Sequence, residues 1–234
     1  MLPAVPAAAF MAALALGEAG DHLAAAAAFD DFVASYPAHE AAADALFNAG
    51  YFLERAGDAE AANQRYEHYI RRFPLRENTP TLRFRLAGRY TDSLDLELAV
   101  QHYDRLYLDF PDNQDAPDAL FNASWIRAAL SDPEGAALGF ERYSSWNRPD
   151  AEQVHWLAGA QWEKVGEAEA LAFYRRHLKC YPDQSPDHML AARRRLAELD
   201  APPDEPAEAA PGKPELRGQP DATVIPVAGP AFIR

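Results

Sequence analysis

A repeat of 37 residues constrains the fold of this chain more than any other feature of its sequence. Tyr36-Pro37, Phe73-Pro74 and Phe110-Pro111 stand at this equal spacing, and prolines 149 and 182 end two further segments. Proline lacks the amide hydrogen that a helix needs and moves the preceding residue out of the helical region. We therefore expect a row of similar helical units, each packing on its neighbours.

Two helices are expected in each unit. In the first two units a Gly-Asp pair separates them, because glycine allows the left-handed helix end and aspartate caps the next helix. Each second helix carries an alanine and then large residues at steps of four and three, which places them on one face. We interpret this stripe as core rather than as a cofactor site. It consists of Ala25, Phe29, Phe32, Ala62, Tyr66, Tyr69, Ala99, Tyr103, Leu106, Ala136, Phe140, Tyr143, Ala170, Tyr174 and His177.

The pattern within a unit resembles the tetratricopeptide repeat. In the second unit the matching residues are Leu46, Ala49, Gly50, Leu53, Ala62, Tyr66 and Pro74. The resemblance covers residues from about 5 to 199 and implies a right-handed α-α superhelix, that is, an all-α solenoid. The period of 37 residues exceeds the family's period of about 34. Long units that end in Tyr-Pro or Phe-Pro resemble those of bacterial cell-envelope proteins of this family.

The expected organisation is one solenoid over residues 1–200, followed by a tail. It has five helix pairs, over residues 5–37, 41–74, 79–111, 115–149 and 151–182, and a capping helix over 186–199. The tail, residues 201–234, holds eight prolines and almost no large apolar residue before Val224. Such a segment cannot bury enough surface to offset its ordering entropy, so we expect it to be disordered.

Composition and motifs argue against several classes of function. A net charge of -14 disfavours binding to nucleic acid and to anionic membranes. The chain has no glycine-rich phosphate loop, no nucleophile elbow and no metal-binding histidine motif, so we expect neither an enzyme nor a cofactor or metal site. The single cysteine, Cys180, excludes an internal disulfide and is expected to be a small buried residue.

The compartment is left open. The apolar segment 1–16 follows the repeat's own helix positions, so we interpret it as a first helix, with a signal peptide as the alternative. The protein is expected to be soluble. It is cytoplasmic if Met1 is the true start, and periplasmic or envelope-associated if the resemblance holds or the chain is part of a longer protein.

The resemblance also implies a concave groove lined by defined positions of the first helices. Phenylalanine recurs at one of these positions in four units, 37 residues apart each time, and two asparagines match the family residue that hydrogen-bonds a peptide backbone. The phenylalanines could instead pack between adjacent first helices. The candidate groove residues are Phe10, Phe47, Asn48, Tyr51, Phe84, Phe121, Asn122, Trp125, His155 and Trp162.

From these candidate groove residues we predict a non-enzymatic scaffold that binds a peptide or helix of another protein. Acidic residues at the groove rim favour an apolar or basic segment by complementarity. The alternative is a structural module that self-associates or belongs to a longer array in the bacterial cell envelope. The oligomeric state is left open. The expected rim residues are Glu18, Asp44, Glu54, Asp92, Asp118, Glu152 and Glu163.

Overall fold

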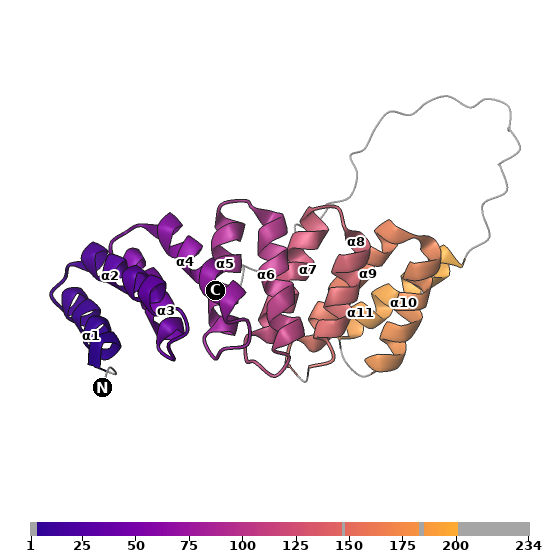
Figure 1. Ribbon diagram of the computed structural model, residues 1–234. Coiled ribbons are helices and arrows are strands. Elements are labelled where there is room, and N and C mark those ends of the chain that lie inside the picture. The colour runs from indigo at the N-terminus through magenta and orange to yellow at the C-terminus, as the bar shows by residue number, and fades with distance from the viewer. Residues whose placement is uncertain (1–3, 147, 183–184, 201–234) are drawn as a thin grey trace, which may run out of the picture. The chain divides into compact units, whose positions relative to one another are not determined.

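The structure is a computed structural model that describes residues 4–146, 148–182 and 185–200. These residues form helices joined by short turns and contain no strand, so the predicted all-α fold is confirmed (Figure 1). None of the helices in these ranges is long and apolar enough to cross a membrane. The helices are α1 (Ala4–Glu18), α2 (His22–Ser35), α3 (Ala42–Arg55), α4 (Ala59–Arg72), α5 (Thr79–Asp92), α6 (Leu96–Asp109), α7 (Ala116–Ala129), α8 (Pro133–Tyr143), α9 (Ala151–Val165), α10 (Glu167–Cys180) and α11 (Pro186–Leu199).

The described part of the chain divides into two compact units, with the boundary between Ala123 and Ser124. In the first unit, α1 to α6 form a row in which each helix packs mainly on the helices before and after it. In the second unit, α8 to α11 do the same. Packing restricted to sequence neighbours is the defining property of a helical repeat array. The predicted tail lies outside the described residues.

The turns within the helix pairs follow the expected chemistry with two variations, at Leu94 and at Ser131, whose φ is 62°. Gly20 and Gly57 take φ angles of 86° and 84°, the left-handed conformation that glycine adopts without cost. Leu94 takes the same conformation in the third pair, with φ of 65°, although it carries a side chain. The carboxylate of Asp58 accepts a hydrogen bond from the backbone amide of Ala61 at 3.0 Å and so caps α4.

The aromatic stripe of the second helices forms the core, as the spacing predicts. Every residue of the stripe is at most 3 % exposed, and Phe29, Tyr66 and Phe140 are fully buried. Burying one such side chain contributes about 2–3 kcal/mol. The expectation for Cys180 is wrong, because this residue is exposed at the end of α10.

Candidate interaction surface

Phenylalanine occupies the same place on α1, α3 and α5. Each ring is half-buried and lies against an aromatic ring of the second helix in its own pair. The rings therefore fill the space between paired helices and keep one part open to solvent. The ring pairs and their centroid distances are Phe10 with Phe29 (5.1 Å), Phe47 with Tyr66 (6.0 Å) and Phe84 with Tyr103 (5.5 Å).

On α3, one turn beyond Phe47, lies the most exposed of the candidate residues. The Tyr51 side chain is 38 % exposed, and its ring centroid is 5.2 Å from that of the buried Phe52. The Tyr51 hydroxyl accepts a hydrogen bond of 3.3 Å from Arg55 Nη1, which holds the ring on the surface of α3. Asn48, on the same helix, is half-buried.

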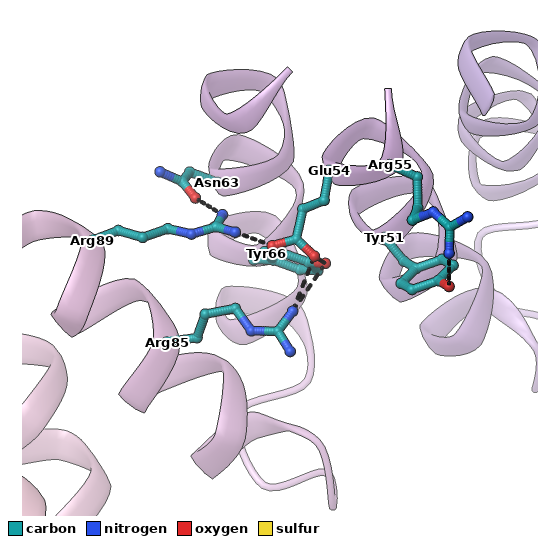
Figure 2. A network of polar contacts seen from close by, with 7 residues as sticks. All are labelled: Tyr51, Glu54, Arg55, Asn63, Tyr66, Arg85 and Arg89. Carbon is teal, nitrogen blue, oxygen red and sulfur yellow. Dashed lines mark hydrogen bonds and ion pairs between the residues drawn. The ribbon is translucent and has the colours of Figure 1, made fainter. Parts of the chain in front are cut away.

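A polar network around Glu54 links α3, α4 and α5 (Figure 2). The Glu54 carboxylate accepts hydrogen bonds from the Tyr66 hydroxyl at 2.8 Å and from Arg85 Nη1 at 3.0 Å. Arg89 forms an ion pair with Glu54 and donates to the side-chain oxygen of Asn63. Burial, followed by the hydrogen bond to Glu54, raises the pKa of Tyr66, so this hydroxyl remains a donor.

The network changes the expected charge of the rim, since Glu54 is neutralised by two arginines. The Glu163 carboxylate likewise accepts a hydrogen bond of 2.7 Å from Arg195. Glu152 is only 2 % exposed and lies 2.7 Å from His188 Nδ1. At these three positions the predicted acidic rim is therefore paired within the chain and is not a free charge. Glu18 and Asp44 are exposed.

Four of the candidate groove residues are buried. Phe121 is 6 % exposed, Asn122 0 %, His155 5 % and Trp162 8 %, so these side chains offer little surface to a ligand in this structure. The Trp162 indole donates a hydrogen bond to Glu141. Trp125 is half-buried, with its ring centroid 6.3 Å from that of Phe140.

His155 belongs to a buried cluster that the sequence did not predict. Its Nδ1 lies 3.0 Å from Nδ1 of His177, whose Nε2 lies 3.4 Å from the Glu152 carboxylate. Burial lowers the pKa of both histidines to about 4. His188 approaches the same carboxylate from α11, so the cluster joins three helices. No group of three His, Cys, Asp or Glu residues in the described ranges is placed to hold a metal ion.

Arg85 and Arg89 are not among the site residues that the sequence predicted. A signal was present, because these residues stand 37 positions after Asn48 and Phe52 and therefore depart from the repeat. Their partner Glu54 is 31 and 35 residues away. Such a contact cannot be inferred from spacing within one helix.

Comparisons with known proteins identify a repeat family for the N-terminal helices. The tetratricopeptide repeat model matches residues 7–39 and 44–75. None of the curated proteins compared with the chain matches it. Solved structures with similar folds include a tetratricopeptide repeat protein from Parabacteroides merdae, with 17% identity over 83% of this chain and 72% of that chain and a TM-score of 0.49.

Two further structures are similar at the same level. One is the C-terminal part of a TPR repeat-containing protein from Cytophaga hutchinsonii, with 14% identity, coverage of 85% of each chain and a TM-score of 0.47. The other is MamA from AMB-1, with 16% identity over 79% of this chain and 96% of that chain and a TM-score of 0.47.

The row of helix pairs, each packed on its neighbours around a buried aromatic stripe, defines the class of α-helical repeat proteins. Within this class, residues 7–39 and 44–75 match the tetratricopeptide repeat, and the two matched segments correspond to the helix pairs α1–α2 and α3–α4.

Proposed function

We propose that this protein is a non-enzymatic scaffold that binds an extended or helical segment of another protein along α1, α3 and α5. The observation that carries the proposal is the recurrence of half-buried phenylalanine rings at one place on these three helices. Aromatic side chains that are partly buried before binding are rigid, so they lose little conformational entropy when a ligand covers them. Such residues are the usual anchors of protein interfaces.

The proposed contact residues differ in role. Phe10, Phe47 and Phe84 form an apolar floor, and Tyr51 adds an exposed ring with a polar tip. Asn48 is proposed to hydrogen-bond the ligand backbone. An apolar segment suits this floor best. A preference for basic ligands rests on the exposed carboxylates of the rim, because the Glu54 carboxylate is already paired with arginines.

The test uses a binding segment obtained by affinity capture with the purified protein and then synthesised as a labelled peptide. Its affinity is measured by fluorescence anisotropy for the wild type and for the double variant Tyr51→Ala/Phe84→Ala. We expect the affinity to fall at least about tenfold, as removal of interface anchors does, while the helical circular dichroism is unchanged.

The matched control is Leu23→Ala, which shortens an apolar side chain that is 61 % exposed on the second helix α2. This variant should bind like the wild type. Wild-type affinity in the double variant, or an equal loss in the control, would show that the ligand lies elsewhere.

A second candidate function is self-association through α1. This helix has one charged residue, Glu18, and exposes Val5 and Met11 at 52 % and 62 %. A helix with a single charged residue and exposed apolar side chains favours contact with another apolar surface. Sedimentation velocity at several concentrations tests this function: a concentration-dependent dimer that Met11→Glu abolishes supports it, and a strict monomer excludes it.

A further inference from the structure

The junction between α4 and α5 departs from the repeat at a core position. Leu46 on α3 and Leu120 on α7 stand 37 residues before and after Arg83, and they are only 1 % and 2 % exposed. Arg83 therefore occupies a place where the neighbouring repeats bury leucine, and its side chain is 11 % exposed. A charged residue in a core position of one repeat conflicts with the rest of the fold, and such conflicts are expected at functional sites.

A cavity accompanies this substitution. α4 packs much less closely on α5 than α2 packs on α3. The space between α4, α5 and α6 has a volume of about 800 Å³, within the range of pockets that hold small molecules. Its cationic lining residues are Arg71, Arg83 and Arg105, one from each of the three helices.

The hydrogen-bonding groups of the Arg83 guanidinium are not all satisfied within the protein. Its Nε is buried without a hydrogen-bond partner among the described residues. The carboxylate of Asp109 lies 3.8 Å from Arg83 Nη2, beyond hydrogen-bond distance, and 3.9 Å from Arg105 Nη1. Burial lowers the pKa of Arg83. A buried guanidinium with an unsatisfied N–H group and only a long ion pair is costly, so the site favours an additional anion.

Glu67, another acidic group of the cavity, is engaged by other partners. Glu67 lies 2.8 Å from His102 Nε2 and accepts a hydrogen bond of 2.9 Å from the Tyr90 hydroxyl. Asp104 also lines the cavity and makes the lining mixed in sign, which favours a small ligand with one anionic group over a polyanion.

We propose that this cavity binds an oxyanion, the phosphate or carboxylate group of a small molecule, through Arg83 with Arg71 and Arg105. A guanidinium presents parallel N–H groups that match two oxygens of such an anion, so the ligand would supply the partners that Arg83 lacks. The site shares no residue with the proposed protein-binding surface. It is therefore a separate binding function of the same repeat array.

The test is an NMR titration of the full chain with inorganic phosphate and, separately, with acetate, at an ionic strength kept constant with sodium chloride. We expect saturable shifts of backbone amides in residues 67–74, 83–90 and 101–109 with at least one of the two anions. The anion that binds more tightly identifies the ligand group as phosphate or carboxylate.

The decisive variant is Arg83→Leu, which introduces the residue of the neighbouring repeats. The variant should adopt the native structure, because leucine is buried at the matching positions. Its affinity for the anion should decrease by a factor of at least about ten. The matched control, Arg76→Leu, removes the same charge from an exposed place in the α4–α5 turn and should bind like the wild type.

If Arg83→Leu does not fold, the exposed residues Arg71 and Arg105 provide the test, since Arg71→Gln and Arg105→Gln should each weaken binding severalfold. Absence of saturable shifts in the wild type overturns the proposal. Equal loss in Arg76→Leu also overturns it, because the effect would then be general charge screening.

Discussion

The effect of substituting a single residue depends on the space around it, as Gly50 and Gly88 show. A Cβ on Gly50 would lie 2.5 Å from a ring carbon of Tyr66, which is fully buried and cannot move aside. A Cβ on Gly88 would meet nothing within 4 Å. Close helix packing thus requires glycine at residue 50 but not at residue 88.

The two glycines should respond to alanine with opposite sign. Gly88→Ala should stabilise the protein by about 0.5–1 kcal/mol, because alanine has the higher helix propensity. Gly50→Ala should destabilise it by about 1–3 kcal/mol through overpacking against Tyr66. Urea denaturation followed by circular dichroism measures both. Stabilisation by Gly50→Ala would mean that α3 and α4 are less closely packed than described.

At the scale of the helices, the histidine cluster makes the stability of the packing between α9, α10 and α11 dependent on pH. His155 and His177 have pKa values lowered to about 4 by burial, against an unfolded value of about 6.5. The unfolded chain therefore binds more protons than the folded chain between these values. Their contribution to stability is present above pH 6.5 and is lost as the pH falls towards 4.

We expect the unfolding free energy of the second unit to decrease by a few kcal/mol between pH 6.5 and 4. The chain's four tryptophans, Trp125, Trp146, Trp156 and Trp162, all lie in this unit, so their fluorescence reports its unfolding in urea. The comparison variant is His155→Phe, whose aromatic ring cannot titrate. The unfolding free energy of this variant should depend less on pH than that of the wild type. An equal dependence would show that His155 does not contribute to it.

At the scale of the whole molecule, packing restricted to sequence neighbours limits how far a local defect spreads. α1 to α6 form one row and α8 to α11 another, and each helix depends mainly on adjacent helices. The stability of such an array is approximately a sum of repeat and nearest-neighbour terms. Destabilisation should therefore remain near the altered repeat.

Phe140→Ala should lower stability near α8 by about 3–5 kcal/mol, because it leaves a cavity in the buried stripe. Hydrogen exchange measured by mass spectrometry should show lost protection in α8 and α9, which pack on each other, and unchanged protection in α1 to α3. A uniform loss over all helices would instead show that the chain unfolds as one cooperative unit.

The sequence by itself determined the helices, the turns and the core stripe, because proline positions and the spacing of large residues act within one helix or one repeat. It also placed Phe10, Phe47 and Phe84 on equivalent faces. Only the tertiary structure decided which candidate side chains are buried, as with Phe121 and Trp162. It also paired Glu54 with arginines 31 and 35 residues away. Burial and ion pairing depend on neighbouring repeats in space, so a pattern within one helix pair does not encode them.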